Sequence, residues 1–180
     1  MGYETVMLEF MKPLLPLLGL SALLSACGTG LIPPVTQNLP DINAVLPTAS
    51  AGTPMVIYPK GNQFDSSSPL AGSVNSVEIE GNLTYTGFGN LSGVGVYVRA
   101  DSVGCIDGGT YFACTGDESA NRLNDLTVIK GQPGPVKLAG KQLTAAVQRK
   151  FGLIGFQVLS GSSLSGDKIS VTDVKATIRF

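Results

Sequence analysis

The chain contains no histidine and no tryptophan among its 180 residues. Without histidine it has no Ser-His-Asp triad, no imidazole general base and no imidazole ligand, which excludes most designs for hydrolases and zinc sites. The absence of tryptophan weakens the case for an aromatic sugar-binding platform, although tyrosine can form one. The sequence therefore favours a function without catalysis, and no motif in it predicts a metal or another cofactor.

Charged residues are also scarce, at 14% of the chain, with 12 Lys and Arg against 13 Asp and Glu. Because phosphate binding needs a basic excess, we expect no nucleic-acid partner. The charges are unevenly distributed: residues 27–129 carry three basic and nine acidic side chains, whereas residues 130–180 carry eight and two. Either the two halves interleave and neutralise each other, or they form a bipolar surface that orients the protein against a charged partner.

Long hydrophobic runs are missing as well. The uncharged stretch of residues 13–26 is shorter than the roughly 20 residues that a membrane-spanning helix takes, but it suits the apolar core of a signal peptide. The residues before it include Glu4 and Glu9 and no basic side chain, whereas a start at Met11 would place a lysine directly before the apolar stretch. We therefore expect a signal peptide over residues 1–26, with Met11 as its favoured start.

The sequence Leu24-Ser25-Ala26-Cys27 follows at the end of the apolar stretch. These residues resemble the lipobox of bacterial lipoproteins, a family in which a peptidase cuts before the cysteine and the thiol receives a diacylglyceryl group. The new amine is then usually acylated. The resemblance implies that Cys27 is the lipidation site, and it says nothing about the domain that follows. The alternative is an ordinary signal peptide with an incidental cysteine.

The resemblance also implies a location. Gly28 stands where an aspartate would resemble the inner-membrane retention signal of enteric bacteria, so an outer-membrane or surface destination is favoured. Several acyl chains, each stabilised by about 0.8 kcal/mol per buried methylene, make release from the membrane very slow. The membrane would then be one partner, reached through the acyl chains on Cys27.

Residues 28–54 contain five prolines and no sustained periodicity. Proline at this density opposes helix and sheet hydrogen bonding, so we expect residues 27–54 to be the lipidated cysteine and an extended tether. As polyproline II the tether would reach roughly 80 Å. The alternative is that part of it, such as residues 39–47, packs on the domain as an irregular strap.

Two segments of the remaining domain, residues 55–180, alternate apolar and polar side chains as half-buried strands do. Residues 77–85 place four apolar side chains on one face and polar ones on the other. Residues 93–100 place three valines inward and Tyr97 outward. The sequence TGFGN between these segments is a turn signal, so the two strands are predicted to form a hairpin.

The C-terminal segment, residues 168–180, changes phase. Its apolar residues occupy odd positions up to Val171 and even positions from Val174 on, which implies a bulge near Thr172-Asp173. Further strands are predicted over residues 123–131, 134–140 and 152–161, and a short helix over residues 142–151. This all-β pattern, with about seven strands and short glycine-rich connections, favours an antiparallel β-sandwich or jelly roll.

With Cys27 acylated, Cys105 and Cys114 remain as an even pair in an oxidising compartment, so we expect a disulfide. Metal binding would need more ligands, and a redox pair usually has CxxC spacing. Tyr111 and Phe112 lie in the loop that the disulfide would close. Aromatic side chains on a braced loop are a candidate contact surface. Alternatively, one of these rings caps the end of the sandwich core.

Two weaker sites involve carboxylates. A paired-carboxylate hydrolase is compatible with the composition, and its candidate residues are Glu78, Glu80, Asp101, Asp107 and Asp117. A calcium site without the DxDxDG order of a calcium loop would use Asp117, Glu118, Asn121 and Asp125. Both patterns are also typical of solvated side chains.

The sequence thus predicts a lipid-anchored protein of the bacterial cell envelope that acts without catalysis, as an interaction or structural accessory module. Besides the membrane, its expected partner is an envelope protein or a glycan. The alternatives are a small carboxylate-dependent envelope hydrolase and a glycan-binding module.

Overall fold

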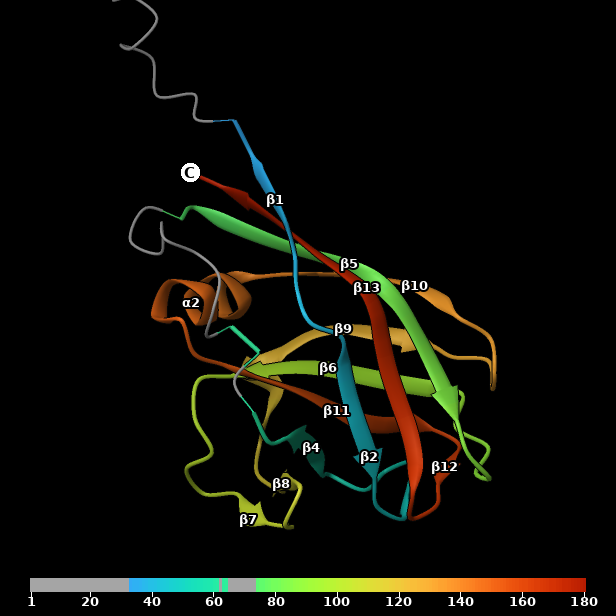
Figure 1. Ribbon diagram of the computed structural model, residues 1–180. Helices are drawn as coiled ribbons and strands as arrows, with labels where there is room; N and C mark the ends of the chain where they lie inside the picture. The colour runs from blue at the N-terminus through green and yellow to red at the C-terminus, as the bar shows by residue number, and fades with distance from the viewer. Residues whose placement is uncertain (1–32, 62, 65–73) are drawn as a thin grey trace, which may run out of the picture. The chain divides into compact units, whose positions relative to one another are not determined.

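The computed structural model describes residues 33–61, 63, 64 and 74–180. The predicted signal peptide with its start at Met11, the lipobox and Cys27 lie outside the described residues. The described chain forms antiparallel sheets that pack together around a shared core (Figure 1). The predicted all-β sandwich fold is confirmed.

The first sheet is built on β5 (Ser76–Thr86) and β13 (Asp167–Arg179), which pair antiparallel over most of their length. On one side β10 (Gly134–Ala139) pairs with β5. On the other side β1 (Val35–Asn38) and β2 (Ile42–Leu46) pair one after the other with β13. The polar alternates of β5 and β13 face away from the core, as the period-2 patterning predicts.

The second sheet contains six strands among the described residues, in the order β7-β8-β4-β11-β6-β9. Their bounds are β7 Ile106–Asp107, β8 Tyr111–Cys114, β4 Val56–Pro59, β11 Leu153–Ser160, β6 Gly93–Arg99 and β9 Arg122–Thr127. A small ribbon pairs β3 (Ala49–Ser50) with β12 (Ser162–Ser163). The helical elements of the described chain are the 3-10 turn η3 (Ser119–Asn121) and α2 (Lys141–Arg149). The strands predicted over residues 134–140 and 152–161 are confirmed as β10 and β11.

The tether prediction is wrong from residue 35 onward. Strand β2 alternates buried and exposed residues and continues the first sheet beyond β13, and Leu39 donates its N–H to the carbonyl of Val174 at 2.8 Å. The prolines do not prevent this pairing because Pro40 and Pro47 lie between the short strands, where no ladder hydrogen bond is required. The alternative of a packed strap is nearer to the structure, but the strap is a regular edge strand.

The predicted hairpin is also wrong. β5 belongs to the first sheet and β6 to the second, so residues 87–92 cross from one sheet to the other. Both strands bury their apolar faces in the same core from opposite sides, which satisfies the same alternating pattern. The pattern therefore indicates which face is buried and leaves the pairing partner open.

The bulge in the last strand is confirmed. The register of β13 against β5 shifts between Thr172 and Lys175, and Asp173 has a φ of 55°. Val171 and Val174 are consequently both buried although an odd number of positions separates them. Because of the bulge, the one long strand buries apolar side chains in the core both before and after the register shift.

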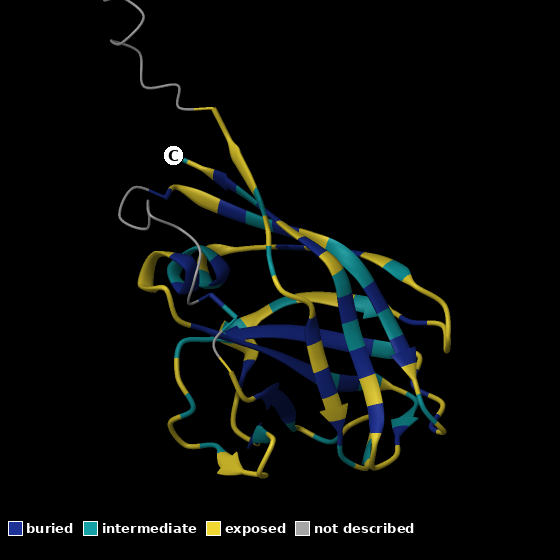
Figure 2. Ribbon diagram, viewed as in Figure 1, coloured by how far each residue is buried: buried dark blue, intermediate teal, exposed yellow. Residues whose placement is uncertain are grey.

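Buried residues lie on strands of both sheets (Figure 2), and their side chains form one core cluster. Helix α2 covers part of this core with Leu143, Ala146 and Val147, in agreement with the helix predicted over residues 142–151. No helix in the described part of the chain is long and apolar enough to cross a membrane.

A second, smaller cluster contains Val56, Tyr58, Tyr97, Cys114 and Leu153. Tyr97 was predicted to face solvent, but it is only 3% exposed because this cluster covers it. The ring of Tyr58 lies against Gly155, where an added Cβ would come within 2.5 Å of the ring. The six-stranded sheet is thus covered on both faces at this end. Alternation of apolar and polar residues predicts a strand with one exposed face, so it does not predict this second buried face.

Candidate functional site

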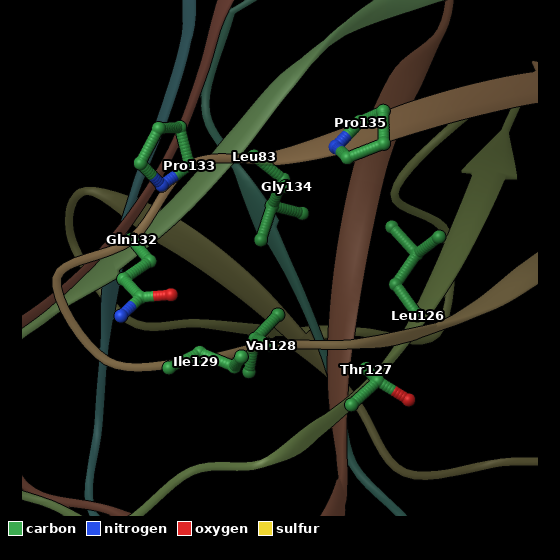
Figure 3. Close-up of a pocket in the computed structure, with 9 residues that line it drawn as sticks. All are labelled: Leu83, Leu126, Thr127, Val128, Ile129, Gln132, Pro133, Gly134 and Pro135. Atoms are coloured by element: carbon green, nitrogen blue, oxygen red, sulfur yellow. The ribbon is translucent and has the colours of Figure 1, made fainter.

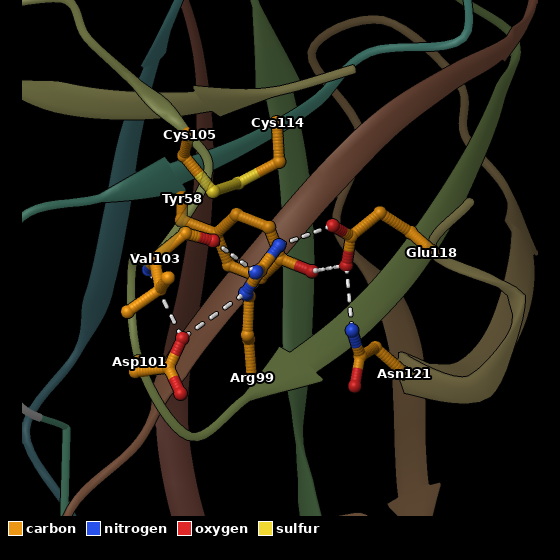
Figure 4. The surroundings of a disulfide bond; sticks show 8 residues. All are labelled: Tyr58, Arg99, Asp101, Val103, Cys105, Cys114, Glu118 and Asn121. Atoms are coloured by element: carbon orange, nitrogen blue, oxygen red, sulfur yellow. Dashed lines mark hydrogen bonds and ion pairs between the residues drawn. A yellow bond between two sulfur atoms is a disulfide. The ribbon is translucent and has the colours of Figure 1, made fainter. Parts of the chain in front are cut away.

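Cys105 and Cys114 form a disulfide, as the sequence predicts, with their Cα atoms 4.3 Å apart. The bond ties the loop after β6 to the end of β8 (Figure 4). Cys114 belongs to the smaller cluster, and Cys105 packs against that cluster. The bridge therefore fixes the loop to the buried side chains on the outer face of the second sheet.

Removing this bridge with the double substitution Cys105→Ala and Cys114→Ala should lower the free energy of unfolding by about 2.5–3 kcal/mol, the chain-entropy value for a loop of about ten residues. Alanine avoids an unpaired hydroxyl at the buried position 114. Urea unfolding measures the change. The wild type treated with reductant should unfold at the same urea concentration as the double variant. If neither unfolds at a lower urea concentration than the oxidised wild type, the expectation is wrong.

Tyr111 and Phe112, the predicted contact residues, are half-buried. Phe112 packs against the smaller cluster, and the Lys60 ammonium lies 5.0 Å from the centre of its ring. The Tyr111 ring lies against Gly108. Phe112 is thus held against the smaller cluster and Tyr111 against its own loop, and the contact surface stays a prediction.

A buried polar network lies beside the disulfide (Figure 4). Glu118 is only 7% exposed, and its Oε2 accepts hydrogen bonds from the Tyr58 hydroxyl at 2.9 Å and from Asn121 Nδ2 at 2.7 Å. Its Oε1 pairs with the guanidinium of Arg99, which also donates to the carbonyl of Val103. Burial, together with the hydrogen bond to Glu118, raises the pKa of Tyr58 far above its usual value, so the phenol remains a donor. The network anchors the loop from inside.

The four residues of the calcium hypothesis are committed to three other contacts, one of which Glu118 and Asn121 share. Glu118 belongs to the buried network, Asp125 pairs with Arg122, and Asp117 accepts the N–H of Ser119 at 2.9 Å. Among the described residues, no group of three or more acidic or cysteine side chains is placed to hold a metal ion. The structure gives this hypothesis no support.

The carboxylates of the hydrolase hypothesis are likewise dispersed. Glu78 and Glu80 share Lys137, whose Nζ lies 2.6 and 3.5 Å from them, while Asp107 lies 2.7 Å from Lys60. The hydrogen bond from Lys137 holds the pKa of Glu78 below its usual value. The Lys60 hydrogen bond does the same to the pKa of Asp107. A general acid needs the opposite shift.

Asp101 and Asp117 complete the set. Asp101 lies 3.7 Å from Arg99 and accepts the N–H of Val103 at 3.0 Å. The N–H of Ser119 holds the pKa of Asp117 below its usual value. Glu78, Asp107 and Asp117 thus have a pKa shifted away from that of a general acid, and the five nominated carboxylates are dispersed over separate contacts.

A different centre, which the sequence analysis did not identify, lies at Asp167. This carboxylate is 1% exposed and accepts the Tyr85 hydroxyl at 2.5 Å and the N–H groups of Phe88, Gly89 and Leu164 at 2.8, 3.1 and 2.8 Å. Burial would raise the pKa of Asp167, but these four donors more than offset it and hold the pKa below its usual value. The charged carboxylate of Asp167 therefore joins two turns through hydrogen bonds.

These turns belong to one end of the sandwich, which we call the loop end and define as residues 86–92, 128–133 and 160–166. Asn90 donates its N–H to the Ser162 carbonyl at 3.0 Å, and Gly131 donates to the Tyr85 carbonyl at 2.8 Å. Figure 1 places the corresponding connections after β5, after β9 and around β12 on one side of the molecule. Segments distant in sequence are thus brought into a single surface.

The loop end exposes apolar side chains. Phe88 is 91% exposed, Ile129 59% and Leu164 44%. A shallow pocket of about 260 Å³ adjoins Ile129 between β9 and β10 (Figure 3), and its apolar lining includes Leu83, Leu126, Val128, Ile129, Pro133 and Pro135. The one sequence signal for this surface was Phe88 at the centre of a glycine-flanked turn, where a large apolar residue has no neighbouring core to join.

No protein-family model matches this chain, and a search of curated proteins finds no similar sequence.

Proposed function

We propose that this protein is a lipid-anchored, non-enzymatic module of the bacterial envelope that binds a partner close to the outer membrane. The lipobox resemblance ending at Cys27 is the observation that carries the proposal. Its expected partners are the membrane, through acyl chains on Cys27, and an envelope protein or a glycan within reach of the anchor.

The position of the first strand limits that reach. Seven residues, 28–34, separate Cys27 from Val35, the first residue of β1, so eight Cα-to-Cα steps join the two. At no more than about 3.6 Å per residue, this segment spans at most about 29 Å, far less than the tether predicted from proline content. The first strand of an anchored domain would therefore stand close to the lipid surface.

The absence of catalysis is supported by the carboxylates. Each nominated acidic side chain is held by a basic side chain or a backbone N–H. The glycan alternative is weakened because, of the four tyrosines that the structure describes, Tyr58, Tyr85 and Tyr97 are at most 3% exposed and Tyr111 is half-buried. A protein or lipid surface fits the exposed aliphatic and phenylalanine side chains better.

The anchor is tested by intact-mass analysis of the membrane fraction from a bacterium that processes lipoproteins. We expect a mature chain that begins at Cys27 and carries the added mass of a diacylglyceryl group and an amide-linked acyl chain. The variant Cys27→Ser should lack this mass and remain unprocessed. A mature wild-type chain that begins at Cys27 without lipid would refute the anchor.

A further inference from the structure

Five of the eight exposed large apolar side chains among the described residues lie at two places, and the two places differ in charge. Near the disulfide, Val103 and Ile106 are 76% and 66% exposed, and the carboxylates of Asp101 and Asp107 lie beside them in the chain. The loop end exposes Phe88, Ile129 and Leu164. Its three turns contain no Asp or Glu at all.

The charges at the loop end are basic. Lys130 lies in one of the turns, with its Nζ 3.5 Å from the carbonyl of Gly89, and Lys168 is exposed directly after the loop end. The nearest carboxylate in the chain is Asp167, which is buried and accepts four hydrogen bonds. The surface thus combines an aromatic tip with ammonium groups and no solvent-facing carboxylate in its turns.

The tip is also held in place. Asp167 fixes the backbone on both sides of the exposed ring through the N–H groups of Phe88 and Gly89, and it fixes the neighbouring turn through Leu164. An apolar side chain on a braced turn loses little conformational entropy when it is buried in a partner. The exposed Phe88 therefore lies on a turn that is already ordered before a partner binds.

We propose that the loop end is a lipid-docking surface that inserts Phe88, Ile129 and Leu164 into the interface of an anionic bilayer. Lys130 and Lys168 face the anionic headgroups. Aromatic and aliphatic side chains partition into the bilayer interface, and basic side chains beside them are attracted to anionic lipid. The inference rests on the proposed function for the anchor, which brings the surface to a membrane.

The chain's lack of tryptophan allows a direct test with the full lipidated protein in vesicles. Phe88→Trp places a single indole at the tip, and the matched variant Ile106→Trp places one at the acidic end. In vesicles containing phosphatidylglycerol, emission from the Phe88→Trp protein should shift to the blue and be quenched by brominated acyl chains. The Ile106→Trp protein should show neither effect.

A second variant tests the charge. Adding Lys130→Gln to Phe88→Trp should weaken docking roughly fivefold, since each basic side chain near an anionic leaflet contributes a factor of that order. Phosphatidylcholine vesicles should give weaker quenching of the unmodified Phe88→Trp protein. Equal quenching at both ends, or none at Phe88→Trp, would overturn the proposal.

The remaining outcomes are also decisive. A blue shift that depends on protein concentration and not on brominated lipid would assign the surface to a second copy of the chain and would overturn lipid docking. Failure of the anchor is recognised separately, because it appears as missing acyl mass. Failure of docking appears as unshifted emission from a protein whose acyl mass is intact.

Discussion

Replacing Asp167 by asparagine is expected to lower the free energy of unfolding by about 2–3 kcal/mol, because a buried acceptor of four hydrogen bonds loses its charge and one of its acceptor atoms. Oδ2 accepts from Tyr85, Gly89 and Leu164, and Oδ1 accepts from Phe88. Whichever way the amide is oriented, its NH₂ group faces at least one backbone N–H that has no other acceptor there. Chemical denaturation measures the loss.

The matched control is Asp173→Asn in the same strand. Asp173 is exposed at the bulge with a positive φ, a conformation that asparagine adopts as readily as aspartate, so the stability should not change. Gly87→Ala should reproduce the Asp167 defect from the other side, since its Cβ would lie 2.0 Å from Asp167 Oδ1. If the Asp167 and Asp173 variants are equally stable, the hydrogen bonds to Asp167 do not contribute to stability.

The same variant predicts a pH dependence. The pKa of Asp167 is lower in the folded protein than its ordinary value, so the unfolded chain binds the proton more readily. The stabilisation is complete above the unfolded pKa of about 3.9 and is lost as the pH falls through the folded pKa. The stability difference between wild type and Asp167→Asn should therefore shrink on acidification. Other carboxylates titrate equally in both proteins and cancel in that difference.

The sequence predicts features that depend on neighbouring residues better than features that depend on residues far apart in the chain. The alternation in β5 and the phase change in β13 report burial at each position, and both predictions are confirmed. Alternation does not report which strand lies alongside, so β5 and β6 were wrongly joined although they face one core. The short strands β1 and β2 were missed because the prolines at their ends dominated the local composition.

The loop end was missed for a related reason. Asp167 follows a glycine in a polar turn and has the sequence context of a solvated residue. Two of its donors, Phe88 and Gly89, are 79 and 78 positions away in the chain. The buried role of Glu118 was hidden in the same way, because Tyr58 is 60 positions away. By contrast, the disulfide was predicted correctly because its two cysteines and the turn between them lie in one short segment.

The buried network at Glu118 gives the second large expected effect. Glu118→Leu should lower the free energy of unfolding by about 3 kcal/mol, because it leaves the Tyr58 hydroxyl without its acceptor and Arg99 without its buried counter-charge. The Arg99 side chain is 21% exposed and keeps its contact with Asp101, which places the cost at the lower end for a broken buried ion pair. Urea unfolding of the variant measures the loss.

Further variants separate the loss of the network from the loss of packing. Asp117→Asn removes charge from the adjacent exposed carboxylate, which accepts only a local N–H from Ser119, and should leave stability unchanged. The triple variant Tyr58→Phe, Arg99→Met and Glu118→Leu removes the buried hydroxyl and the charge that Glu118→Leu strands, and leaves only the half-buried Asn121 without its Glu118 acceptor. It should recover most of the stability that Glu118→Leu loses, since apolar groups of similar volume often replace a buried ion pair without cost. If the triple variant is less stable than Glu118→Leu alone, the network stabilises the loop through packing and not through the paired charges. The reason given for the Glu118→Leu effect would then be wrong.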